Sequence, residues 1–176
     1  EDMPGFSWTD MQGKTIIGDT PESSAGILLE MELRKNQIPP YRQVSVYYNV
    51  PQDLKKGAFK AEIAAFLQAS EPMVSELELE ETGQVVASLT GDRIPAYVYV
   101  TNSSKLQEEP EKYQRFANGL HKGFLWMEHH PDLIYEQAKS HFRHIDDLVL
   151  KQAVSRYIED KIWPQTPLIN QNSVEQ

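Results

Sequence analysis

Hydroxyl side chains gather in one segment that follows a short apolar run of the sequence. The segment Thr20–Gly26 contains Thr20, Ser23 and Ser24, and a helix is predicted to begin within it. Free N–H groups at the start of a helix, joined by hydroxyls, can bind an anion or a polar oxygen. The same serines also fit a plain helix cap, and the charge of Glu22 would repel an anion. A zwitterionic or neutral heteroaromatic ligand therefore fits at least as well as a simple anion.

Further polar and aromatic side chains follow other apolar runs. Ser70 and Glu71 come after one of them, and Glu71 can accept from an amine or ring N–H, or can stabilise the start of its own helix. Asn49 follows another run and is either a third ligand contact or an ordinary turn residue. Tyr97 and Tyr99 lie two apart in a predicted strand, so one of them either stacks on a planar ligand or packs in a core.

The residue types and spacings of most catalytic and metal sites are missing. The chain has no Cys, which excludes disulfides, cysteine–zinc sites and a thiol nucleophile. No Gly-x-Ser-x-Gly elbow, Walker loop, dinucleotide glycine motif or His-Glu-x-x-His occurs. His141 and His144 have the spacing of a metal pair, but a helix break predicted at His144–Ile145 favours exposed linker histidines. We therefore expect no cofactor, no metal and no enzymatic activity.

Charge and hydropathy narrow the class of partner. The 176 residues carry a formal net charge of −9 and a sequence pI near 5.0, which argues against nucleic acid and against an anionic membrane surface. The acidic run of Glu76, Glu78, Glu80 and Glu81 is either a solvated helix face or a docking patch or cation site. No apolar run approaches the roughly 20 residues of a membrane-spanning helix.

The first half of the chain alternates strand-like and helix-like segments. The predicted order is strand Lys14–Gly18, a helix from Ser23 or Ser24 to Pro39, strand Gln43–Tyr48, helix Leu54–Ala61, strand Ala64–Gln68 and a helix opening near Glu71. Such a βαβαβα order predicts an α/β fold with a mainly parallel sheet and right-handed crossovers. Because loops after parallel strands leave at one edge, the polar segments above should converge there.

Composition changes in the second half. Two strands, Gln84–Leu89 and Ala96–Thr101, are predicted around a turn at residues 90–93. Three helices should follow, at Pro110–His129, Asp132–Phe142 and Asp146–Ile162.

Several short motifs occur in an order that resembles one family of proteins. They are the opening from Phe6 through Gly13-Lys14 to Gly18, then Ala58–Ala61, Ser70-Glu71-Pro72, Ile94–Thr101, and Glu109-Pro110-Glu111 continuing to Trp126-Met127 and His130-Pro131. This order resembles the type II periplasmic binding proteins that serve ABC transporters for sulfonates, nitrate and pyrimidine precursors of thiamine (the NMT1-like type). Two positions depart from the family: Glu62 replaces its usual Gly and Ala65 its usual Asp, which puts in doubt a ligand contact through that Asp.

The resemblance implies a domain organisation. Residues 1–95 correspond to the second lobe, βαβαβα plus a strand, with a hinge at its end. Residues 96–176 correspond to the return crossing and the C-terminal helices of the first lobe, whose N-terminal part is missing from the sequence. We expect about a hundred further residues and a signal or lipoprotein sequence before Glu1. Without the missing strands, the apolar side chains of Phe116, Leu120, Phe124 and Leu148 predict a homodimer of this chain, or helices repacked on the second lobe.

The resemblance also implies a function. A small organic ligand, such as a sulfonate, a nitrate-like anion or a pyrimidine or thiamine precursor, would be captured in an interlobe cleft, and the closed protein would dock on an ABC permease in the membrane. The expected location is periplasmic or extracytoplasmic, with a lipid anchor as one option. Two alternatives stay open: a pyrimidine-precursor synthase on the same fold, which usually needs a Cys, and a ligand-sensing domain of a larger receptor.

Overall fold

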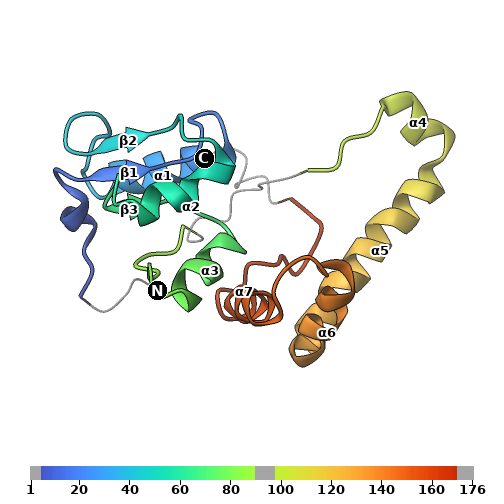
Figure 1. Cartoon of the computed structure of the whole chain (residues 1–176). Coiled ribbons are helices and arrows are strands. Elements are labelled where there is room, and N and C mark those ends of the chain that lie inside the picture. The colour runs from blue at the N-terminus through green and yellow to red at the C-terminus, as the bar shows by residue number, and fades with distance from the viewer. Residues whose placement is uncertain (1–4, 90–97, 170–176) are drawn as a thin grey trace. The chain divides into compact units, whose positions relative to one another are not determined.

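The computed structural model describes residues 5–89 and 98–169 and divides the chain into two compact units, Glu1–Gly91 and Asp92–Gln176 (Figure 1). Within the first unit, a short 3-10 helix η1 (Trp8–Met11) precedes β1 (Thr15–Ile17), α1 (Ser24–Lys35), β2 (Ser45–Tyr47), α2 (Gln52–Lys60), β3 (Phe66–Leu67) and α3 (Met73–Leu79). This confirms the predicted βαβαβα order.

The three strands form one parallel sheet with β1 in the centre. The strand order is β2-β1-β3, and Ile16 of β1 pairs in register with Val46 of β2 and with Phe66 of β3. The predicted parallel sheet is therefore confirmed. From β1 the chain moves to one side to form β2, and from β2 it crosses back past β1 to form β3. Right-handed crossovers in opposite directions place α1 and α2 on opposite faces of such a sheet.

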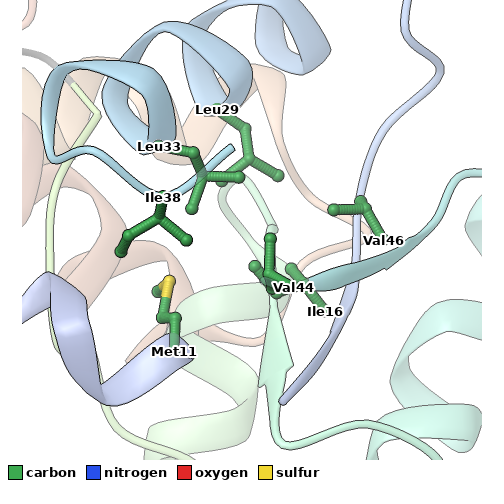
Figure 2. Packing of buried hydrophobic residues seen from close by; sticks show 7 residues of the cluster. All are labelled: Met11, Ile16, Leu29, Leu33, Ile38, Val44 and Val46. Atoms are coloured by element: carbon green, nitrogen blue, oxygen red, sulfur yellow. The ribbon is translucent and has the colours of Figure 1, made fainter. Parts of the chain in front are cut away.

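One face of the sheet carries the main core of this unit. Leu29 and Leu33 of α1 lie one helical turn apart and are almost fully buried against Ile16, Val44 and Val46. Figure 2 shows Met11 of η1 and Ile38, which follows α1, closing the same cluster. The next residue of β1, Ile17, is also fully buried. Because side chains alternate along a strand, it points to the opposite face from Ile16, so the central strand is covered on both sides.

The elements in the described part of the second unit are helices. They are α4 (Ser103–Glu108), α5 (Pro110–His129), α6 (Pro131–His141) and α7 (Asp147–Glu159). The three predicted helices are confirmed, α5 with the predicted bounds, whereas α4 was not predicted. Ile134, Leu150 and Val154 form the buried cluster of this unit. Asp146 caps α7, because its Oδ1 accepts from the N–H of Leu148 at 2.9 Å.

The two strands predicted before the helices are not confirmed. Residues 84–89 and 98–101 have no strand pairing, and residues 90–97 lie outside the described part of the chain. Val85 uses its N–H on the Glu78 carboxylate at 3.1 Å, so it donates to a side chain instead of a neighbouring strand. A strand needs a partner edge, which a short run of strand-favouring residues alone does not supply.

The longest helix keeps its apolar side chains accessible. None of the described residues of α5 is buried, and Phe116 is 48% exposed. A hollow of about 600 Å³ lies along this helix, lined by Phe116, Gly119, Leu120, Gly123, Phe124, Trp126, Met127 and Gln137. The self-association expected from these side chains stays a prediction. None of the described helices combines the length and the apolar character that crossing a membrane requires.

Candidate ligand-binding edge of the sheet

The loops that carry the candidate residues all leave the sheet at the carboxyl ends of its strands. Thr20, Ser23 and Ser24 follow β1, Asn49 follows β2, and Ser70 with Glu71 follows β3. In the order β2-β1-β3, the chain connects β1 to a strand on one side and later adds β3 on the other side. The position between β1 and β3 is therefore a topological switch point, where open α/β sheets bind their ligands. The sequence therefore predicted the placement of these six residues, and their contact with a ligand stays a prediction.

Ser23 is the cap of α1. Its Oγ accepts from the N–H of Gly26 at 3.0 Å and donates to the carbonyl of Thr20 at 2.7 Å. The hydroxyl of Ser23 therefore donates within its own loop, as expected if Ser23 serves only as a helix cap. Ser24 is exposed at the first position of the helix. Within the described chain, the N–H groups of Ser24 and Ala25 have no protein acceptor, which leaves two donors at the positive end of α1.

Gly26 lets the loop fold back on the helix. A Cβ at this position would lie 2.2 Å from the carbonyl oxygen of Thr20 and 3.2 Å from that of Asp19. Only glycine leaves room for this approach. The close packing of Thr20 on the first turn of α1 therefore depends on Gly26, a role that the sequence pattern did not predict.

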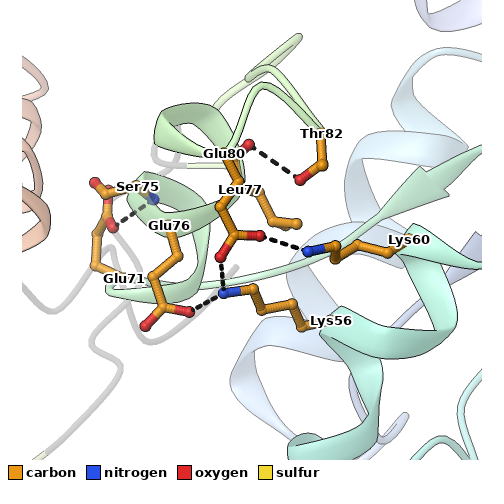
Figure 3. A network of polar contacts seen from close by, with 8 residues as sticks. All are labelled: Lys56, Lys60, Glu71, Ser75, Glu76, Leu77, Glu80 and Thr82. Carbon is orange, nitrogen blue, oxygen red and sulfur yellow. Dashed lines mark hydrogen bonds and ion pairs between the residues drawn. The ribbon is translucent and has the colours of Figure 1, made fainter.

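Glu71 lies at the start of α3. Its Oε2 accepts from the N–H of Ser75 at 3.1 Å, so this carboxylate stabilises its own helix (Figure 3). Of the two interpretations of Glu71, the geometry matches the helix-start one. The preceding residue, Ser70, is exposed, and its carbonyl accepts from Val74 at 3.4 Å.

Aromatic side chains surround the exposed Asn49. A hollow of about 400 Å³ beside β2 is lined by Tyr41, Val46, Tyr47, Tyr48, Asn49 and Val50. Tyr48 donates to Glu30 Oε1 at 3.0 Å. Burial of the Tyr48 hydroxyl, with its hydrogen bonds to Tyr41 and Glu30, raises its pKa far above the ordinary tyrosine value. Reasoning from the sequence missed this hollow, although the tyrosines on both sides of β2 were a visible signal.

Tyr97, the last of the candidate residues, lies outside the described part of the chain. Its neighbour in the predicted pair, Tyr99, is 79% exposed and packs edge-on against Phe116 with ring centroids 5.0 Å apart. Among residues 5–89 and 98–169, no group of three or more His, Asp or Glu could hold a metal ion.

Lys55 and Gln68 are buried polar residues that no motif in the sequence indicated. Lys55 of α2 is 2% exposed and donates to Asp19 Oδ1. Gln68, which follows β3, is 9% exposed; its Oε1 accepts from Asp19 N–H at 3.0 Å and its Nε2 donates to the Ala25 carbonyl at 2.5 Å. These contacts link the loop after β1 to α2 and to the residue that follows β3.

Comparison with known proteins assigns the family. A family model described as NMT1/THI5 like matches residues 6–134, about three quarters of the chain. This chain belongs to the NMT1/THI5-like family. The resemblance found in the sequence motifs is thereby confirmed.

Two relatives of this NMT1/THI5-like chain are named for binding. YtlA of Bacillus subtilis (strain 168), a protein provisionally named as a binding protein, is 25% identical over 178 residues, which cover 99% of this chain and 53% of YtlA. The alkanesulfonate-binding protein SsuA from Xanthomonas axonopodis pv. citri, solved bound to MOPS, matches with a TM-score of 0.64 and 15% identity. The match covers 90% of this chain and 61% of SsuA.

These matches settle the fold. It is the α/β fold of type II periplasmic binding proteins, with a parallel sheet flanked by helices. The chain spans about half of the length of YtlA and somewhat more of SsuA. Neither relative's name mentions an enzymatic activity.

Proposed function

We propose that the protein containing this chain captures a small organic solute outside the cytoplasm and delivers it to an ABC permease in the membrane. The observation that carries the proposal is the convergence of three polar loops at the carboxyl edge of the β2-β1-β3 sheet. In this proposal the edge forms one wall of the ligand site. Membership of the NMT1/THI5-like family and the binding role named for two relatives support it.

The first turn of α1 is the proposed anchor for an acidic or polar oxygen of the ligand. Ser24 N–H and Ala25 N–H have no protein acceptor in the described chain, and the exposed Ser24 hydroxyl adds a third donor. The exposed carboxylate of Glu22 adds negative charge nearby and favours a ligand that also carries an N–H or a positive charge. A sulfonate, a nitrate-like anion and a pyrimidine or thiamine precursor all remain candidates, and the sulfonate bound to SsuA supplies a first probe.

The two serines allow ligand binding to be separated from helix capping. Ser23→Ala removes the cap and should cost about 1 kcal/mol of folding free energy, measured by thermal unfolding. Ser24→Ala leaves the cap intact, so folding should change by less than about 0.5 kcal/mol. If Ser24 donates to the ligand, the same substitution should weaken binding by about 1–3 kcal/mol.

The experiment uses the full-length protein. Native mass spectrometry first identifies any small molecule that co-purifies, and calorimetric titration with that molecule and with MOPS then compares the two variants with wild type. Equal affinities for wild type and Ser24→Ala would rule out the first turn of α1 as the ligand anchor.

A further inference from the structure

One buried amide joins three elements at the carboxyl edge of the sheet. Gln68 follows β3, accepts from the backbone N–H of Asp19 directly after β1, and donates to the carbonyl of Ala25 in the first turn of α1. Both ends of the loop that holds Thr20, Ser23 and Ser24 are therefore tied to the same side chain. Because Gln68 is only 9% exposed, water cannot readily replace these bonds if the amide is lost.

A buried ammonium, that of Lys55, also binds Asp19. Lys55 lies in α2, the helix that follows β2 and Asn49, and it donates to the carboxylate of Asp19. A buried charge is costly unless it is paired, so Lys55 must stay with Asp19 for as long as its Nζ is out of water. The Asp19 side chain keeps 32% of its surface exposed, against 3% for Lys55.

Asp19 is consequently held through its main chain by Gln68 and through its side chain by Lys55. We infer that Asp19, Lys55 and Gln68 are positioning residues that set the relative places of the three ligand loops. The inference rests on the proposed function, because it assigns a role in binding to contacts that would otherwise only stabilise the fold. Preorganised loops lose less entropy when a ligand binds, so affinity should depend on this cluster.

Lys55→Met separates positioning from stability. The substitution replaces a buried ammonium by an apolar chain of similar length, and the carboxylate of Asp19 that loses its partner is exposed enough to be hydrated. Global stability should therefore change little, whereas Asp19 and the loop after it should move more freely. Gln68→Met tests the other arm of the cluster. Lys60→Met is the matched control, because Lys60 lies on the same helix, is exposed and bonds to Glu80 of the segment after α3.

The measurement is amide hydrogen exchange on the full-length protein, with thermal unfolding and MOPS titration of each variant. Lys55→Met and Gln68→Met should raise exchange in residues 19–26 by about tenfold or more, and Lys60→Met should leave it unchanged there. The unfolding temperature of Lys55→Met should stay within about 5 °C of wild type, whereas Gln68→Met should lower it further because two buried backbone groups lose their partner. If wild type binds MOPS, its dissociation constant should rise by about tenfold in both variants.

Three results would overturn the inference. They are unchanged exchange in residues 19–26, a uniform rise across the first unit together with a lower unfolding temperature in Lys55→Met, or faster exchange with unaltered MOPS affinity. Failure of wild type to bind MOPS or any co-purified molecule counts against the proposed function instead, and the exchange data then decide the positioning role by themselves.

Discussion

Gly26 offers the sharpest residue-level test of how the candidate loop is built. In the first turn of a helix, alanine is normally the better residue by about 0.5–1 kcal/mol. Here a Cβ would lie 2.2 Å from the carbonyl oxygen of Thr20, so backbone must move. Gly26→Ala should therefore lower the free energy of unfolding by about 1–3 kcal/mol, measured by urea denaturation.

Gly57 is the matched control for this substitution. It lies inside α2, it is exposed, and a Cβ there would meet nothing within 4 Å. Gly57→Ala should raise the free energy of unfolding by about 0.5–1 kcal/mol. A gain in stability from both substitutions would mean that the Thr20 loop moves aside freely and does not pack closely on α1.

The sequence predicted the short-range contacts of the site but not its long-range contacts. The capping role of Ser23 was among the interpretations because a serine before a helix is a short-range pattern, and its bond to Gly26 spans three residues. Lys55 and Gln68 carry no such pattern, since their bonds to Asp19 span 36 and 49 residues. A lysine and a glutamine are usually exposed, so nothing local predicted that these two are buried.

At the scale of elements, two lysines of α2 form ion pairs with α3 and with Glu80, the residue that follows this helix. Lys56 donates to Glu76 at 2.6 Å and to Glu80 at 2.7 Å, and Lys60 donates to Glu80 at 2.8 Å (Figure 3). The acidic run is thus partly an interface between elements of this unit and not only a solvated face. The hydrogen bond from Lys56, followed by that from Lys60, holds the pKa of Glu80 below its ordinary value of 4.5.

This linkage predicts how α3 responds to acid. Because the pKa of Glu80 is lower in the folded state, its stabilising effect is present above pH 4.5 and is lost as the pH falls through the folded value. Protection of residues 73–79 against hydrogen exchange should therefore decline as the pH falls below 4.5. High salt should weaken the same protection, because it screens the ion pairs. Lys56→Met should reduce both dependences. Lys105→Met, which removes an exposed lysine paired with Glu108 inside α4, should leave residues 73–79 unchanged.

Helices were easier to predict than strands for a physical reason. The bounds of α5 followed from its apolar spacing and from Pro110 at its first turn, both of which lie within the helix itself. Residues 84–89 are mostly apolar and include two valines, as a strand often does, yet they have no partner strand in the described chain, and pairing is decided by distant residues. The short α4 was not predicted. Asn102 caps its start, but its six residues are too few to show a helical periodicity.

At the scale of the whole chain, each unit has its own buried cluster. Leu33 is fully buried in the cluster of the first unit, and Leu150 is 6% exposed in the cluster of the second. Separate cores of this kind allow the units to unfold in separate steps, so a single two-state transition is not expected. The family match runs from residue 6 to residue 134 and thus includes parts of both units.

The same substitution placed in each core tests this expectation and, with it, the predicted division of the chain. Leu33→Ala and Leu150→Ala remove the same atoms from buried sites and should each cost about 2–5 kcal/mol in the unit that contains them. Calorimetry of the chain should show two transitions, with Leu33→Ala lowering one and Leu150→Ala the other, and hydrogen exchange should place each loss in its own unit. If both substitutions lower one shared transition by similar amounts, the two units unfold together, and the boundary predicted near residue 95 does not separate independent cores.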